Sequence, residues 1–344
     1  MRQAGARLWV AAAFAVLCAA PFAPSGQDST SEPSARPAPA AIGQEKPIMP
    51  KAPKFWYEDN NQRQAGGYPP DFHEMFMRPE KWERLRGLID VYYIRGNTLK
   101  NILAAYGEPF VRDHFVKVLR DGNIPIAIDN PIGTTQTIPL LRGYGATVSH
   151  AAFQSVISKC LPHEVPQRVE EAIRLVVEMK KTFPDIKVGL IDANPTKGRE
   201  YKGPYRRLVE GVAAAGCRLD FIHLDCPCDQ ADSGERVSWE KVKEVERFVQ
   251  KELGLEFGFI CVSARGGKTS DERFYRDVMT IPDRYINDGS LPDLPDHFIL
   301  MSWFPHPARA VPEDAPEGEY PMAKTALHLA KALRALPAAP SHAE

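Results

Sequence analysis

The chain has 344 residues, of which 44% are hydrophobic, so it can bury a sizeable core in one large domain or two small ones. A formal net charge of −1 provides no overall field for capturing nucleic acid or an anionic membrane surface. The composition therefore excludes an electrostatic nucleic-acid binder and favours a small partner that is neutral or locally charged.

The first residues follow the order of a secretory signal peptide. Arg2 and Arg7 precede an apolar run, "LWVAAAFAVLCAA", and small residues and prolines follow it. The run is too short to span a bilayer comfortably. We therefore expect a signal peptide over residues 1–26, a secreted or periplasmic protein, and no further membrane association. An uncleaved membrane anchor is the alternative.

Two segments lack the large apolar residues that repay the entropy of ordering a chain. Residues 27–53 are rich in Pro, Ala and Ser, and residues 337–344 have a similar composition. The first segment is predicted to be a disordered linker and the second a disordered tail. The folded domain is therefore expected to span residues 54–336.

Short apolar runs alternate with longer amphipathic segments through this domain. The runs predict eight strands, at 54–58, 88–94, 124–129, 146–150, 186–192, 219–225, 255–263 and 297–303. Helical spacing is clearest in "VPQRVEEAIRLVVEMKKTF", where Val169, Ile173, Val176 and Val177 recur every three or four residues. Further helices are predicted at 205–215, 239–253 and 271–281, with a last one in "MAKTALHLAKALRAL".

Alternation of strands and helices indicates an α/β protein with a parallel sheet and helical crossovers. Eight repeats favour a single closed (β/α)8 TIM-type barrel over an open doubly wound parallel sheet. The open sheet remains the second choice, because the first and fourth strands have the weakest signals. No glycine fingerprint for a dinucleotide or a P-loop follows any predicted strand, so we expect no nucleotide, and no other cofactor is indicated.

A barrel carries its site at the C-terminal ends of its strands, and there the chain has polar and aromatic residues and several aspartates. The candidate catalytic residues are Asp129, Asp192 and Asp225, and the candidate substrate-binding residues are Tyr93, Arg95, His150, Asn194, His223, Arg265, Trp303 and His306. Such a mixture suits a carbohydrate, whose hydroxyls need planar acceptors and whose CH faces stack on aromatic rings. An aspartate after a strand is also a common helix cap, which is the competing interpretation for Asp129 and Asp192.

Several motifs resemble an uncharacterised group of secreted bacterial proteins related to glycoside hydrolase (β/α)8 barrels. They are "MRPEKWERLRGLIDVYYI", "IKVGLIDANP" with "LDFIHLD", and "HFILMSWFPHPARAVPE". The match covers Pro79 to Trp82, His223 to Asp225, Ser302 with Trp303, and Pro312 with Glu313. The resemblance implies a glycoside hydrolase-type barrel with an oligo- or polysaccharide partner.

The chain departs from that resemblance where catalytic acids are expected. His150 and Ala151 follow the fourth strand in place of acids, and Asp192 replaces a glutamate after the fifth. The seventh strand ends in "CVSARGG" and offers no carboxylate either. A hydrolase would therefore take its two carboxyl groups from Asp129, Asp192 and Asp225.

Strands five and six are adjacent in a barrel, so Asp192 and Asp225 are expected to lie close together. One would then raise the pKa of the other and make it an acid. The competing hypothesis is a catalytically degenerate barrel that binds a carbohydrate through Trp303, Tyr93 and Trp56 without cleaving it.

The segment "DFIHLDCPCDQ" at 220–230 is predicted to deliver His223 and Asp225 to the mouth of the pocket. Cys226 and Cys228 are zinc ligands by type, but one residue between the thiols is fewer than zinc knuckles have, and no metal is predicted. For an exported protein disulfides are the simpler expectation. Five cysteines remain after signal removal, so at least one is unpaired, and the pairing stays open among Cys160, Cys217, Cys226, Cys228 and Cys261.

Overall fold

The computed structural model describes residues 52–59, 70–129, 136–155, 157–193, 195, 198–234, 237–286 and 294–336. The predicted signal peptide, the predicted tail and nearly all of the predicted linker lie outside these residues. Within the described ranges no helix is both long and apolar enough to cross a membrane.

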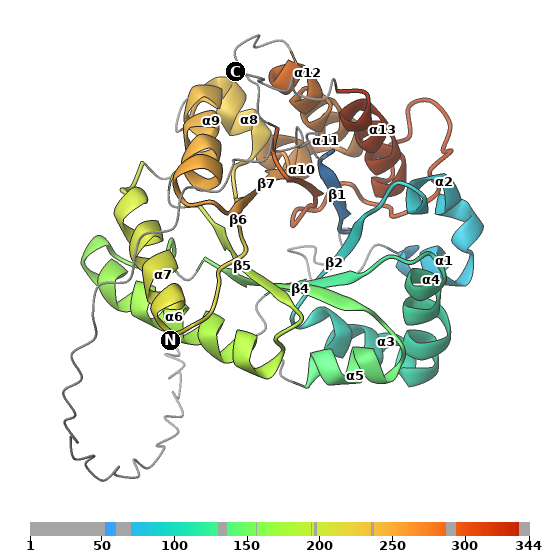
Figure 1. Ribbon diagram of the computed structural model, residues 1–344. Helices are drawn as coiled ribbons and strands as arrows, with labels where there is room; N and C mark the ends of the chain where they lie inside the picture. Colours follow the sequence, from blue (N-terminus) through green and yellow to red (C-terminus); the bar gives the residue numbers. More distant parts are fainter. Residues whose placement is uncertain are drawn as a thin grey trace, which may run out of the picture. The chain divides into compact units, whose positions relative to one another are not determined.

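Eight parallel strands close into a barrel in chain order, and β8 pairs with β1. The strands are β1 (Lys54–Tyr57), β2 (Val91–Arg95), β3 (Ile126–Asp129), β4 (Val148–Gln154), β5 (Lys187–Asp192), β6 (Phe221–Leu224), β7 (Glu256–Cys261) and β8 (His297–Leu300). Helices surround the strands (Figure 1). The (β/α)8 barrel is therefore confirmed, and the open sheet is wrong.

The eight strands are buried on both faces, because helices cover the outside and side chains from opposite strands fill the inside. In β3, β6 and β8 every residue is buried. The two strands with the weakest sequence signals are present, and β4 is the longest of the eight with 7 residues. Along each strand, inward-facing and outward-facing residues alternate, and both kinds are buried. The pattern of polar and apolar residues therefore does not show which residues face the barrel interior.

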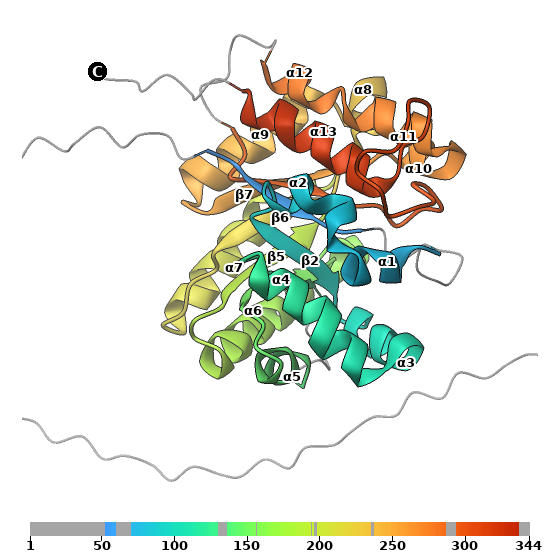
Figure 2. The ribbon, with the colours of Figure 1, turned by 90° about the vertical axis from the view of Figure 1, so that its right-hand side faces the viewer.

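The helices lie outside the barrel (Figure 2). They are α1 (Phe72–Met77), α2 (Glu83–Arg86), α3 (Thr98–Phe110), α4 (Lys117–Asp121), α5 (Thr137–Gly143), α6 (Val165–Thr182), α7 (Lys202–Ala214), α8 (Cys228–Ser233), α9 (Trp239–Arg247), α10 (Ala264–Thr269), α11 (Asp271–Val278), α12 (Ile281–Ile286) and α13 (Met322–Arg334). Short 3-10 segments precede α2 and α6, and π-helical segments at Val111–Val116 and Phe248–Glu252 extend α3 and α9. All five predicted helices are present with shifted ends.

Helix α6 shows why the amphipathic pattern predicted the packing. Val169, Val176 and Met179 are buried. Beside them Ile173 packs on α7 at Gly211, where a Cβ atom would lie only 2.3 Å from the Ile173 Cδ1 atom. The apolar stripe of α6 therefore covers the barrel, and a glycine on α7 allows the two helices to approach closely.

The long segment after β8 is tied to the first helices by carboxylates. Asp71 accepts hydrogen bonds from the backbone N–H groups of Ala310 and Val311 at 2.8 and 3.1 Å. Glu313 accepts one from the backbone N–H of Leu85 at 2.8 Å, and its own N–H donates to the Lys81 carbonyl at 2.9 Å. The "PEKW" motif and the late Pro-Glu motif thus meet in space, and together they fix the segment that carries Trp303.

Candidate active site at the ends of strands β1 to β3

A buried cluster of charged side chains lies at the C-terminal ends of the first three strands. Glu58 follows β1, Arg95 ends β2, and Asp129 ends β3 directly opposite Arg95. The Arg95 Nε atom lies 3.3 Å from Glu58 Oε1. The Gly96 backbone N–H donates to Asp129 Oδ1 at 3.3 Å. Glu58 is 0% exposed and Asp129 is 1% exposed.

Burial gives these two carboxyl groups unusual acidities. Desolvation raises the pKa of Glu58 to about 8; Arg95 opposes the rise, and the negative charges of Asp129 and Asp59 add to it. Desolvation also raises the pKa of Asp129, against the opposing effects of Arg95, Tyr93 and the Gly96 N–H. Glu58 is therefore mostly protonated at neutral pH, whereas Arg95, Tyr93 and the Gly96 N–H offset part of the desolvation of Asp129. Strongly perturbed carboxyl groups of this kind cluster at functional sites.

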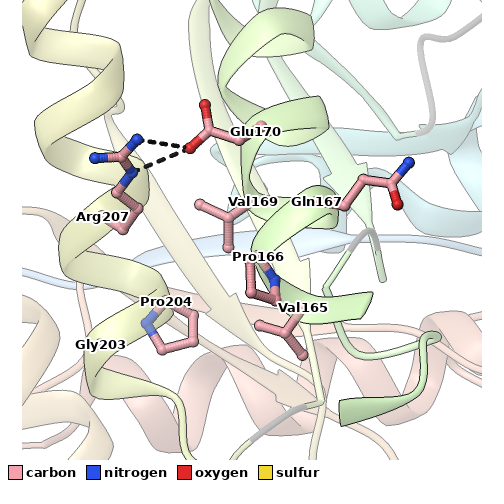
Figure 3. A pocket seen from close by; sticks show the side chains of 8 residues that line it. All are labelled: Val165, Pro166, Gln167, Val169, Glu170, Gly203, Pro204 and Arg207. Atoms are coloured by element: carbon pink, nitrogen blue, oxygen red, sulfur yellow. Dashed lines mark hydrogen bonds and ion pairs between the residues drawn. The ribbon is translucent and has the colours of Figure 1, made fainter. Parts of the chain in front are cut away.

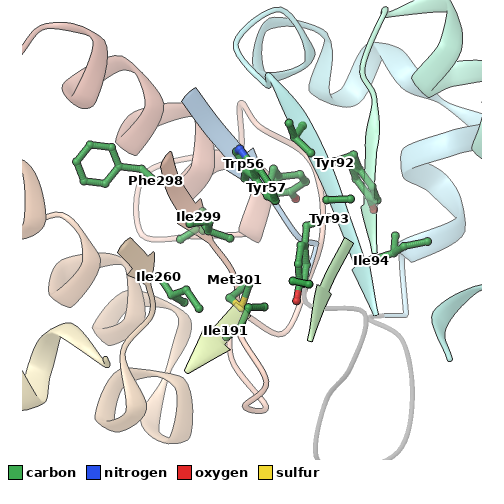
Figure 4. Packing of buried hydrophobic residues seen from close by; sticks show 14 of the residues in the cluster. Trp56, Tyr57, Tyr92, Tyr93, Ile94, Ile191, Ile260, Phe298, Ile299 and Met301 are labelled. Carbon is green, nitrogen blue, oxygen red and sulfur yellow. The ribbon is translucent and has the colours of Figure 1, made fainter. Parts of the chain in front are cut away.

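Aromatic side chains border the cluster. The Trp303 ring lies with its centroid 5.7 Å from the Arg95 guanidinium carbon, and Trp303 is partly exposed. Tyr93 on β2 is buried, and Figure 4 shows it near Ile191 and Met301. The site therefore has a charged side on β1 to β3 and an apolar side formed by later strands.

Asp192 lies on the outer face of the barrel, contrary to the expectation. The Tyr205 hydroxyl of α7 donates to Asp192 Oδ2 at 2.8 Å, and the Ala193 N–H donates to Oδ1 at 3.0 Å. Its neighbour Ile191 lies in the barrel interior (Figure 4). The Asp225 N–H donates to the Asp192 carbonyl at 2.9 Å, so the two backbones are adjacent. The Asp192 carboxylate is nevertheless directed at a helix, because successive residues of a strand point to opposite faces.

Replacing Tyr205 by Phe tests this outer location. The change removes the hydrogen bond to Asp192 and leaves a buried carboxylate with one donor fewer, so we expect the free energy of unfolding to fall by about 1–3 kcal/mol. Urea unfolding measures the loss. Activity of the folded variant is expected to equal that of the wild type, and a loss of turnover without a loss of stability would place Asp192 in the site.

The histidines predicted to bind substrate lie deep in the barrel. His223 is 0% exposed, and its Nε2 atom lies 3.0 Å from His297 Nδ1. His150 is buried as well, with Nδ1 2.7 Å from the Ser149 hydroxyl. His223 is the third residue of β6 and does not follow the strand, so its side chain lies inside the barrel and does not reach the mouth of the site. Asp225 follows β6 and is half-buried.

The remaining predicted residues do not join the cluster. Arg265 is exposed on α10, so the glycine-bearing loop is a short helix, and Ser270 caps α11 by accepting from the Arg273 N–H at 3.1 Å. His306 binds Asp271 through Nδ1 in the segment after β8. Asn194 lies outside the described residues. The structure thus brings Asp129, Tyr93, Arg95 and Trp303 together, and adds Glu58.

Glu58 was missed as a catalytic candidate by sequence reasoning. The predicted catalytic acids were the aspartates Asp129, Asp192 and Asp225, which end or follow the third, fifth and sixth strands. The available signal was the two-residue spacing between Trp56 and Glu58, which places both on the inner face of β1.

The expected disulfides are absent from the described residues. Cys160, Cys217, Cys226, Cys228 and Cys261 are all free thiols. Cys226, Cys228 and Cys261 are 0% exposed and belong to the hydrophobic core, as structural residues do. Among the described residues no group of three or more His, Cys, Asp or Glu side chains is arranged to hold a metal ion.

Thiol labelling tests the free state of these cysteines. In the native protein we expect Cys226, Cys228 and Cys261 to react slowly with an alkylating reagent, because burial leaves them inaccessible and raises their pKa. In denaturant without reductant, all five cysteines are expected to react with the reagent, and mass spectrometry detects the added mass. A pair that becomes reactive only after reduction would contradict this.

A shallow apolar hollow lies away from the cluster, between α6 and α7 (Figure 3). Its lining residues are Val165, Pro166, Gln167, Val169, Glu170, Gly203, Pro204 and Arg207. Arg207 pairs with Glu170 at 2.9 Å across it, and none of the predicted site residues lines it. The site is therefore assigned to the strand ends.

Comparison with known proteins supports the fold. No protein-family profile matches the sequence, and no curated protein matches it. Among solved structures, native xylanase10C from Cellvibrio japonicus aligns with a TM-score of 0.51 at 9% identity, over 85% of this chain and 73% of that chain. The chain has the (β/α)8 barrel fold of these glycoside hydrolases.

Two further solved structures are similar. A mutant of the same xylanase in complex with xylopentaose aligns with a TM-score of 0.50 at 10% identity, over 85% of this chain and 69% of that chain. A glucosidase from Croceicoccus marinus aligns at 14% identity with a TM-score of 0.49, over 84% of this chain and 69% of that chain. At 9–10% identity the likeness to the two xylanase structures shows the barrel fold alone, and the activity has to be argued from the side chains.

Proposed function

We propose that the protein is an exported barrel that hydrolyses glycosidic bonds, with Glu58 and Asp129 as its carboxyl pair. One observation carries the proposal. Two fully buried carboxyl groups with raised pKa values flank the Arg95 guanidinium at the strand ends where barrels place their sites.

Glycoside hydrolysis needs a protonated carboxyl group to donate to the leaving oxygen and a carboxylate to act as base or nucleophile. Glu58 suits the first role, because burial raises its pKa to about 8 and, apart from the Arg95 Nε atom 3.3 Å away, no described residue donates to it. Asp129 suits the second, because the Gly96 N–H and Arg95 stabilise its charge. Different environments thus separate the acidities of two similar groups.

The proposed substrate is an oligo- or polysaccharide. Trp303 offers an aromatic face beside Arg95 on which the CH face of a sugar ring can stack. The xylanase that shares the fold was solved with xylopentaose, which supports a sugar ligand for this chain. Asp225, half-buried after β6, stays a catalytic candidate beside this pair.

A barrel that binds a carbohydrate without cleaving it is the second candidate. It is favoured by the ends of β4 and β7, where Gln154 and Cys261 stand in place of carboxylates. The two candidates differ in turnover rather than in binding.

Binding and turnover of a glycan panel by the purified full-length chain test the proposal. Release of reducing ends, together with binding of the same glycan, is the expected result. Binding without release would favour the second candidate. If no glycan is bound or cleaved, the proposal fails and the glycoside hydrolase likeness is limited to the fold.

A further inference from the structure

A chain of histidines crosses the barrel interior at the end opposite the candidate site. His297 and Glu256 are the first residues of β8 and β7, and His223 is the third residue of β6. The His223 Nε2 atom lies 3.0 Å from His297 Nδ1, and His297 Nε2 lies 3.4 Å from Glu256 Oε2. Three neighbouring strands are therefore linked through side chains inside the barrel.

Trp56 and His150 complete this cluster. The Trp56 ring centroid lies 4.7 Å from that of His150, and 4.9 Å from those of both His223 and His297. Gly258 makes room for His223, since a Cβ atom there would lie 2.3 Å from the His223 Cδ2 atom. The three histidines are 4%, 0% and 1% exposed in chain order, so solvent cannot stabilise a charge on them.

The contacts of His297 favour one distribution of protons over the ring nitrogens. The His223–His297 contact needs a proton on one of its two nitrogens, 3.0 Å apart. With the His297 proton on Nε2, which faces Glu256 Oε2 at 3.4 Å, the Nδ1 atom of His297 is bare and can accept from the Nε2–H of His223. His223 Nδ1 is then a bare, buried nitrogen without a partner among the described residues. A proton on His297 Nδ1 would face the His223 N–H and break the link, and a proton on His223 Nδ1 would be a buried donor without an acceptor.

The charged groups around the cluster do not offset such a proton. The positive charges of Lys54 on β1 and Lys187 on β5 lower the pKa of His150. The negative charges of Glu256 on β7 and Asp296 before β8 raise the pKa of His297, but by less than desolvation lowers it. Lys187 Nζ lies 2.6 Å from Glu256 Oε1, so the negative charge of Glu256 is already balanced. Desolvation lowers the pKa of His150 to about 2 and also lowers those of His223 and His297.

We propose that this histidine cluster is an acid-triggered release device, in which protonation of His223 or His297 breaks the link between β6, β7 and β8 and opens that end of the barrel. The inference concerns the end opposite the strand ends that carry Glu58, and it does not depend on the proposed function.

The sign of the pH dependence follows from the lowered pKa values. An unfolded histidine has a pKa of about 6.5, so below that pH the unfolded chain binds protons that the folded cluster refuses. Stability is fully present above about pH 6.5 and is lost as the pH falls below it. For each pH unit below about 6.5, each buried histidine raises the equilibrium constant for unfolding by up to about tenfold.

Urea unfolding of the full chain between pH 5 and pH 8 tests the proposal. His150→Phe keeps a ring against Trp56, and His297→Gln removes the central link; each is expected to lower the number of protons taken up on unfolding by about one. His163→Gln is the matched control, because His163 is exposed and its removal is expected to leave the slope unchanged. A wild-type slope in both cluster variants would overturn the proposal.

Hydrogen exchange of the wild-type chain needs no variant and keeps the proposal testable if a variant does not fold. Between pH 7 and pH 5, after correction for intrinsic rates, amides of β6 and β8 are expected to lose at least tenfold more protection than those of β2 and β3. Equal loss in all four strands would show global unfolding without a local release and would contradict the proposed device.

Discussion

Replacing Glu58 by Gln is expected to lower kcat for glycan hydrolysis about 100- to 10,000-fold. The amide has the size of the carboxyl group but cannot donate the proton that the leaving oxygen needs. Steady-state release of reducing ends measures the loss, and thermal unfolding of the same sample verifies the fold. An unchanged kcat in a folded Glu58→Gln protein would remove Glu58 from the mechanism.

The pH dependence gives this first prediction a second readout. Since the pKa of Glu58 is raised to about 8, the activity of the wild type is expected to fall as the pH rises through that value. The free energy of unfolding is also expected to fall as the pH rises. Because folding raises the pKa of Glu58, its contribution to stability is complete below the pKa that it has in the unfolded chain and is lost as the pH rises through about 8. Glu58→Gln is therefore expected to gain stability relative to the wild type between about pH 5 and pH 8.

Replacing Trp56 by Ala is expected to lower the free energy of unfolding by about 3–5 kcal/mol. Trp56 is 0% exposed, and its ring packs against three histidines and Phe221 inside the barrel. No neighbouring side chain can collapse into the space, because all of them are held by the closed barrel. Urea unfolding at pH 7.5 measures the change.

Met77→Ala is the control for the truncation of Trp56. Met77 is 54% exposed, so its removal is expected to change stability by less than about 0.5 kcal/mol. A loss below about 1 kcal/mol in Trp56→Ala would mean that the barrel interior is packed differently.

The fold was predictable because strands and helices differ in the period of their apolar residues. Even the weak "KFWYE" segment forms β1, and the helix predicted from Val169, Ile173 and Val176 is α6. The strand ends were predictable to within a few residues, as β2 shows: it was expected over 88–94 and spans Val91–Arg95. Barrel closure followed from the number of repeats.

The direction of single side chains was less predictable. Strands buried on both faces lose the alternation of polar and apolar residues that marks the inner face. Asp192 was therefore assigned to the site although its carboxylate binds Tyr205 on the outside, and Glu58 was left out although it shares the inner face with Trp56. The position of His223 depends on His297, which is distant in the chain, and no local pattern encodes that contact.

Turnover of Asp129→Asn compared with Asp192→Asn tests the central claim most directly. Both changes replace one buried carboxylate oxygen by an amide nitrogen at the end of a strand, and the two residues differ in the face to which they point. The account predicts that Asp129→Asn abolishes reducing-end release and that Asp192→Asn, once shown to be folded, retains it. Retained turnover in Asp129→Asn, or its selective loss in folded Asp192→Asn, would contradict the account.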